Sequence, residues 1–150
     1  MNSEMGSSPI LRVLVAALGA GTVAFGIAPI LAPRTFAAMF GLPHRGEPAA
    51  DVPIRSVSVR DLVNGIGLLA TLNNPNGSLP WLALRFASDT GDAIACWAAA
   101  AHEPRNRRLK MLGVLACGAA LLDASLLAWT QIQRTASTSE AVLCAKREGS

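Results

Sequence analysis

The chain has 150 residues, of which 51% are hydrophobic and only 15% are charged, and its formal net charge is +3. A mean hydropathy of +0.38 is unusual for a soluble domain. Aromatic residues are scarce while alanine and glycine are abundant, which favours close helix packing over a sheet-based core. We interpret the charge as membrane topology plus attraction to anionic membrane lipid, not as a nucleic-acid-binding surface. This composition predicts an all-α integral membrane protein.

Four apolar segments approach or exceed the roughly 20 residues that a membrane-spanning helix needs. They cover residues 11–32, 55–72, 81–101 and 111–130. The first is too long for an ordinary signal sequence, so we expect it to be retained. The sequence predicts one domain, residues 1–134, folded as an integral membrane bundle of four transmembrane helices with a polar interior. The polar residues 135–150 are expected to form a disordered tail.

The connecting segments indicate how these spans are oriented. Residues 34–55 begin as an amphipathic stretch that we expect to lie along the membrane surface. Residues 73–80 are rich in Asn, Pro and Gly, which predicts a compact turn. Most Arg and Lys residues outside the spans fall in the loops after the first and third spans. These two loops are therefore expected to face the cytoplasm, with both termini on the other side.

Polar and charged residues interrupt three of the spans, although each buried ionisable group costs roughly 2.5 to 3.5 kcal/mol on insertion scales. They are Arg60, Asp61 and Asn64 in the second span, Arg85, Asp89 and Asp92 in the third, and Asp123 in the fourth. Helical spacing places those of each span on one face. With a rise of about 1.5 Å per residue, antiparallel packing should bring Asp92 beside Asn64 and Asp89 beside Asp123. We therefore expect these side chains to share a polar interior.

Four carboxyl groups share this expected interior with only two arginines. Burial and like-charge neighbours favour the protonated carboxyl, so one or two of the four are expected to carry a proton near neutral pH. A protonated carboxyl beside an ionised one can give a proton to a substrate and take it back. Two structural interpretations stay open. Each arginine could merely neutralise the aspartate nearby in its own helix, and the remaining aspartates could make structural hydrogen bonds.

The cysteines and histidines give weaker indications of a functional site. Cys96, Cys117 and Cys144 have no metal-binding spacing, and their odd number argues against a disulfide framework. His44 and His102 lie in expected loops. There is no phosphate-binding, nucleophile-elbow or dinucleotide motif. We expect no metal and no cofactor.

Three blocks of the sequence, APRTFAAMFGLP, SVRDLVNGIGLL and ASDTGDAIACW, resemble those of a largely fungal family of small four-helix membrane proteins with a domain of unknown function. That family is related in outline to the DoxX-like proteins. The resemblance implies a four-helix bundle and a place in specialised metabolism, where longer membrane cyclases of terpenoid pathways work through buried acids. DoxX-like relatives are linked to quinone-dependent redox complexes, but no cofactor motif supports that role here.

We therefore expect a membrane-bound isomerase or cyclase in the endoplasmic reticulum or another endomembrane. Its substrate would be a hydrophobic small molecule, a terpenoid or polyketide-like intermediate. Asp61 or Asp92 would donate a proton to it. Asp89 or Asp123 would take the proton back. The two arginines and the asparagine of the second and third spans would bind the substrate.

Two other functions fit the sequence. Alanine or glycine recurs every four residues in the first, third and fourth spans, and such stripes allow close helix contact. A non-catalytic accessory or scaffold subunit would use these faces. A proton-coupled carrier of a small metabolite would use the buried acids and, with four spans, would need to form a homo-oligomer. Asp92→Asn should abolish product formation in an enzyme and be tolerated in a scaffold.

Overall fold

The computed structural model describes residues 8–40 and 48–148, in which α-helices are the only regular elements. They are α1 (Pro9–Leu31), α2 (Pro33–Phe40), α3 (Pro48–Ala70), α4 (Pro75–His102) and α5 (Arg107–Glu148). Helices α1 to α4 each begin at a proline, whose missing N–H is tolerated in the first turn. The all-α prediction is confirmed.

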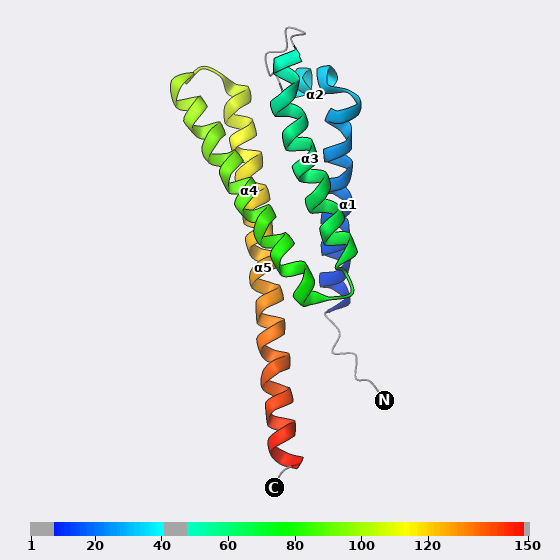
Figure 1. Ribbon diagram of the computed structural model, residues 1–150. Helices are drawn as coiled ribbons and strands as arrows, with labels where there is room; N and C mark the ends of the chain where they lie inside the picture. Colours follow the sequence, from blue (N-terminus) through cyan, green and yellow to red (C-terminus); the bar gives the residue numbers. More distant parts are fainter. Residues whose placement is uncertain (1–7, 41–47, 149–150) are drawn as a thin grey trace.

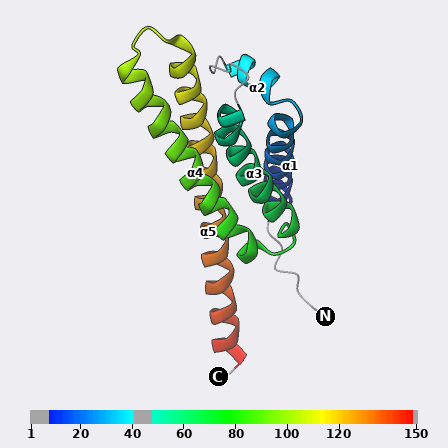
Figure 2. The same cartoon turned by 45° about the horizontal axis from the view of Figure 1, so that its top comes forward.

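The helices form two antiparallel pairs, α1 with α3 and α4 with α5, joined mainly through α3 and α4 (Figure 1). Figure 2 shows the same pairing from a second direction. Helix α2 and the connection between α4 and α5 lie at one end of the molecule, and the start of α1 and the end of α5 lie toward the other (Figure 1). The connections after the first and third predicted spans thus lie at a common end, as expected.

One connection differs from the prediction, and another contains a short helix. Helix α4 begins at Pro75, inside the expected turn over residues 73–80, because the Asn74 side chain accepts a hydrogen bond from the Gly77 N–H at 3.2 Å and caps the helix. Residues 34–40 of the expected surface stretch form most of α2, where Phe36 stacks edge-to-face on Phe25 of α1 at 5.2 Å. Residues 41–47 of that stretch, with His44, lie outside the described residues.

Close contact between α1 and α3 depends on glycine. A Cβ atom on Gly26 would lie 2.7 Å from the backbone nitrogen of Leu62, and one on Gly65 would lie 2.8 Å from the carbonyl oxygen of Gly19. The backbones therefore touch where no side chain separates them. The predicted stripe of α1 does not mark this contact, because Ala20, Ala24 and Ala28 are exposed. The stripe of α4 is also largely exposed, and a Cβ on Gly91 would meet nothing within 4 Å.

The distribution of side chains is inverted relative to a soluble bundle. A small apolar cluster is buried, made of Leu11, Val15, Leu68, Leu82 and Leu126. Many large apolar side chains on all four long helices are exposed, whereas Asp123 is 0% and Asn64 1% exposed. Polar groups inside and apolar groups outside are the pattern of a helical membrane protein.

Two helices, α1 and α5, are long and apolar enough to cross a membrane. Helices α3 and α4 contain the other two predicted spans, and ionisable residues interrupt their apolar sequence. The four-span prediction is thus shown for two helices only.

The C-terminal tail is helical rather than disordered. Helix α5 continues to Glu148 and extends beyond the other helices (Figure 1). The Ser137 and Thr138 hydroxyls donate to the carbonyl oxygens four residues earlier, at 2.9 and 3.0 Å. These hydroxyls are satisfied by the carbonyls of their own helix and the alanines favour it, so a polar sequence can continue the helix without packing on the bundle.

Candidate functional site

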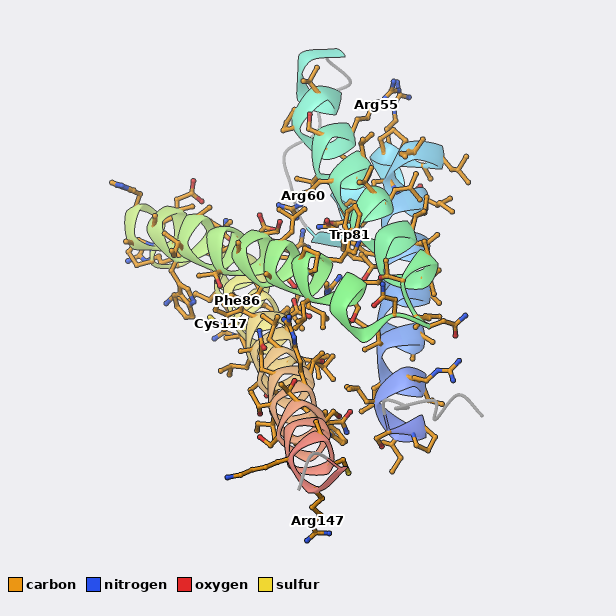
Figure 3. The ribbon with its side chains drawn as sticks, turned by 60° about the horizontal axis from the view of Figure 1, so that its bottom comes forward. Arg55, Arg60, Trp81, Phe86, Cys117 and Arg147 are labelled. Carbon is orange, nitrogen blue, oxygen red and sulfur yellow. The ribbon has the colours of Figure 1, made fainter. Side chains whose placement is uncertain are left out.

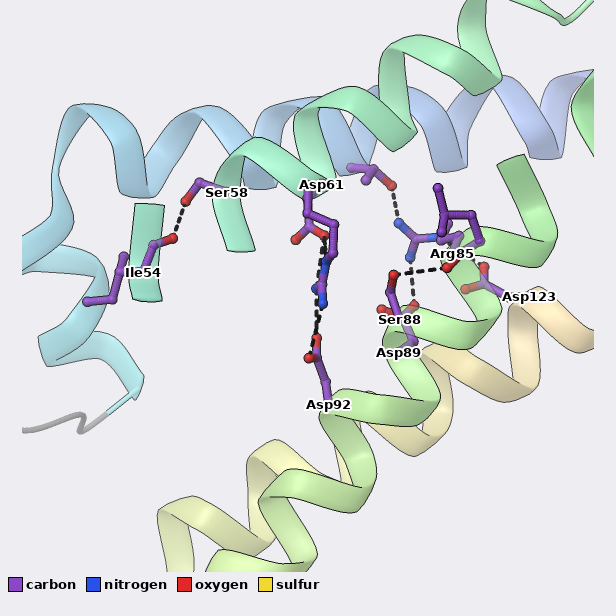
Figure 4. Close-up of polar contacts among 11 residues, drawn as sticks. Ile54, Ser58, Asp61, Arg85, Ser88, Asp89, Asp92 and Asp123 are labelled. Atoms are coloured by element: carbon purple, nitrogen blue, oxygen red, sulfur yellow. Dashed lines mark hydrogen bonds and ion pairs between the residues drawn. The ribbon is translucent and has the colours of Figure 1, made fainter. Parts of the chain in front are cut away.

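A first group of charged residues joins α3 to α4. The Arg60 guanidinium donates to both carboxylate oxygens of Asp92, at 3.2 and 2.8 Å, and twice to Asp61 Oδ1, at 3.1 Å each (Figure 4). The Asp92 side chain is 40% exposed. We call Arg60, Asp61 and Asp92 the outer cluster, because it lies at the edge of the bundle.

A second group lies deeper and joins three helices. Arg85 of α4 donates from Nε to Oδ1 of Asp123 in α5 at 3.0 Å and from Nη2 to Oδ2 of Asp89 at 3.2 Å. Its Nη1 donates to the Thr22 hydroxyl of α1. We call Arg85, Asp89, Asp123 and Thr22 the inner cluster (Figure 4). Arg85, Asp89 and Asp92 share one face of α4, so the two clusters are neighbours.

The predicted contacts are partly present. Asp89 and Asp123 lie together through their shared arginine, as expected. Asp92 instead binds Arg60, which the sequence did not pair with it. Both arginines pair with an aspartate of their own helix, as in the structural interpretation, but each also binds an aspartate of another helix. The guanidinium has donors on three nitrogens and can satisfy both.

Some buried polar atoms in these helices have no hydrogen-bond partner among the described residues. They are both amide atoms of Asn64, Oδ2 of Asp123 and the hydroxyl oxygen of Thr90. Native proteins rarely leave such groups unpaired, which makes them candidates for contact with a bound molecule. Asn64 follows Arg60 and Asp61 by one helical turn, so it shares their face of α3.

Sequence reasoning missed Thr22 and Thr90. Thr22 is the only polar side chain in the uncharged run over residues 13–32, which could have drawn attention to it. Its hydroxyl donates to the Leu18 carbonyl at 2.7 Å and accepts from Arg85. Thr90 directly follows Asp89 and carried no signal of its own.

The family of the chain follows from a match over residues 19–134 to a model described as a domain of unknown function, DUF4267. The chain belongs to the DUF4267 family. No curated protein and no solved structure matches it. Both clusters lie within the region that matches DUF4267, whereas the α5 extension after Arg134 lies outside it.

The remaining candidates do not add to the site. All three cysteines are free, which agrees with the absence of a predicted disulfide framework. Within residues 8–40 and 48–148, no three His, Cys, Asp or Glu side chains are grouped so that they could hold a metal ion. His102 ends α4, away from both clusters.

The charge balance defines what this DUF4267 site can do. In the inner cluster one guanidinium faces two carboxyl groups, and Asp123 is fully buried. A net charge is costly in an apolar interior, so the cluster is neutral when one of the two carboxyls carries a proton. The arrangement can therefore store one proton between Asp89 and Asp123.

Proposed function

We propose that this protein is a membrane-embedded acid–base enzyme, an isomerase or cyclase for a hydrophobic small molecule. The observation that carries the proposal is the inner cluster, in which Arg85 binds both Asp89 and Asp123. Oδ2 of Asp123 has no partner in the part of the chain that the structure describes, and we assign to it the proton that is given to an alkene, epoxide or carbonyl. Asp89 then removes a proton from another position, and the substrate is isomerised without gain or loss of atoms.

This assignment moves the donor from the outer to the inner cluster. Asp92 receives a hydrogen bond from Arg60 on each oxygen, so neither oxygen is left over for a substrate. Asp61 also binds Arg60, through Oδ1. The outer cluster then joins the two helix pairs, while Arg85 and Thr22 position the acid and the base.

We further infer that all four long helices cross a membrane of the endoplasmic reticulum or another endomembrane. Exposed apolar side chains on α3 and α4, such as Val63 and Ile94, support this placement. The charged side chains of Asp61, Arg85 and Asp89 are largely buried between the helices. The three sequence blocks that resemble a largely fungal family support kinship with DoxX-like proteins and a role in specialised metabolism.

A non-catalytic accessory or scaffold subunit is the second candidate. The observation that favours it is that the outer cluster joins the two helix pairs, which a purely structural role would explain. A proton-coupled carrier, acting as a homo-oligomer, would use the inner cluster to exchange protons.

Asp123→Asn separates these functions, because it removes the acid while keeping the shape and the Oδ1 acceptor. We expect cells that carry this variant to accumulate the same precursor as cells without the gene, an isomer of the normal product, in metabolite profiles measured by mass spectrometry. Glu103→Gln, which removes an exposed carboxyl between α4 and α5, is the matched control and should give the normal product.

The comparison requires equal amounts of each variant in the membrane fraction. A normal metabolite profile for Asp123→Asn, together with an altered one for the deletion, would contradict acid–base catalysis and favour the accessory role.

A further inference from the structure

Asn64 is a buried polar residue that belongs to neither cluster. Its side chain is 1% exposed, and neither its oxygen nor its nitrogen has a hydrogen-bond partner within residues 8–40 and 48–148. A buried amide without a partner loses its contacts with water and gains nothing in return. We therefore looked for the molecule that would pair with it.

The helix register places this amide beside the inner cluster. On α3, Arg60 pairs with Asp92 of α4, and a Cβ on Gly67 would overlap the ring of Trp81, also in α4. Figure 3 shows Trp81 where the two helices cross. Asn64 lies between these two levels of α3, so in an antiparallel pair it faces the part of α4 between residues 81 and 92, which carries the inner cluster.

The charges around Asn64 decide which chemical groups can bind there. Both guanidinium groups are already bound to two aspartates each. An anionic ligand would therefore meet carboxylates without a free cation to offset them. The amide itself is neutral and offers one donor group and one acceptor. Its best complement is a neutral oxygen, either a hydroxyl or a carbonyl.

We propose that Asn64 binds the hydroxyl or carbonyl oxygen of a neutral, lipophilic substrate, and that the site rejects carboxylates, phosphates and diphosphates. That the bound molecule is a substrate rests on the proposed function, whereas its binding to Asn64 can be measured without turnover. Of the three residues that the sequence offered for substrate binding, Arg60, Asn64 and Arg85, the proposal keeps Asn64 and leaves out the two arginines.

Trp81 provides a local reporter for the test. The sequence contains three tryptophans, and replacing Trp97 and Trp129 by Phe leaves Trp81 as the single fluorophore. Its ring lies against Gly67, one helical turn along α3 from Asn64. The full-length protein is placed in lipid nanodiscs and titrated with compounds whose bromine quenches tryptophan. These are 4-bromocyclohexanol, 4-bromocyclohexanone, bromocyclohexane and 4-bromocyclohexanecarboxylate, each corrected for its partition into lipid.

We expect the alcohol and the ketone to bind roughly threefold to tenfold more tightly than the hydrocarbon, which corresponds to one net hydrogen bond. The carboxylate should bind no better than the hydrocarbon. Asn64→Leu should remove the preference. Ser125→Ala, which removes an exposed hydroxyl bonded to the Leu121 carbonyl, should keep it and is the matched control.

The proposal is overturned if the alcohol and ketone show no preference, which would leave water as the partner of Asn64. It is also overturned if Asn64→Leu keeps the preference or if the carboxylate binds most tightly.

Circular dichroism checks that each variant is folded, and Asn64→Ala replaces Asn64→Leu should the larger side chain disturb the helix. Alcohol binding together with a normal metabolite profile for Asp123→Asn would retain this site and reject only the acid–base function.

Discussion

Arg85 contacts side chains from three helices, and its role can be separated from that of the acids it holds. Its partners are Asp89 in its own helix, Thr22 in α1 and Asp123 in α5. Removing the guanidinium would leave two buried carboxyls with no cation. The cost of breaking a buried ion pair is far larger than the net gain from forming it, because the abandoned charge stays desolvated.

We expect Arg85→Met to lower the free energy of unfolding by about 3 to 5 kcal/mol, the usual penalty for an unpaired buried charge. The double variant Arg85→Met/Asp123→Leu should recover part of this loss, because it removes one carboxyl as well. Reversible unfolding in mixed micelles, followed by circular dichroism, measures both. Equal stability of the single variant and the wild type would mean that the inner cluster contributes no net stabilisation.

The sequence was sufficient to pair Arg85 with Asp89, because a spacing of four residues brings two side chains together on any helix. It did not pair Arg60 with Asp92. That contact depends on the rotation of α3 about its own axis and on its crossing with α4, and neither follows from the spacing within one helix. Thr22 was missed for the same reason.

At the level of the helices, glycine and not alanine sets the closest contact. Gly26 lies against the backbone of α3, whereas a Cβ on Gly21 of the same helix would meet nothing within 4 Å. The sequence predicted alanine stripes because it is rich in alanine. Periodicity alone cannot tell a face that touches another helix from a face that touches lipid.

These two glycines give a matched comparison within α1. Gly21→Ala should be neutral or stabilise the protein by about 0.5 to 1 kcal/mol, because alanine is the better helix former. Gly26→Ala should instead destabilise it by about 1 to 3 kcal/mol, because the added Cβ would lie 2.7 Å from the Leu62 nitrogen. Unfolding midpoints of the two variants, measured side by side, provide the check. A similar change for both would contradict tight packing of α1 on α3.

For the whole molecule, composition predicted the helical class, and the runs of apolar residues predicted the positions of four helical segments. Both depend on sums over many residues. The end of α5 was not predicted. A polar, serine- and threonine-rich sequence is typical of disorder, but here its hydroxyls bond back to the helix. The helix thus continues past the region that matches DUF4267.

The position of Arg85 also has a consequence for biosynthesis. In the four-span arrangement that we propose, a ribosome completes α4 before α5, so Arg85 and Asp89 reach the translocon while Asp123 has not yet been made. With one of its ion-pair partners missing, α4 is poorly suited to leave the channel alone, and we expect it to enter the lipid together with α5 as a hairpin. A glycosylation site placed directly after His102 should therefore be modified in chains truncated there, whose α4 has not crossed, and the same site should stay unmodified in chains that include α5. Synthesis of α5 would in this way determine when α4 enters the membrane.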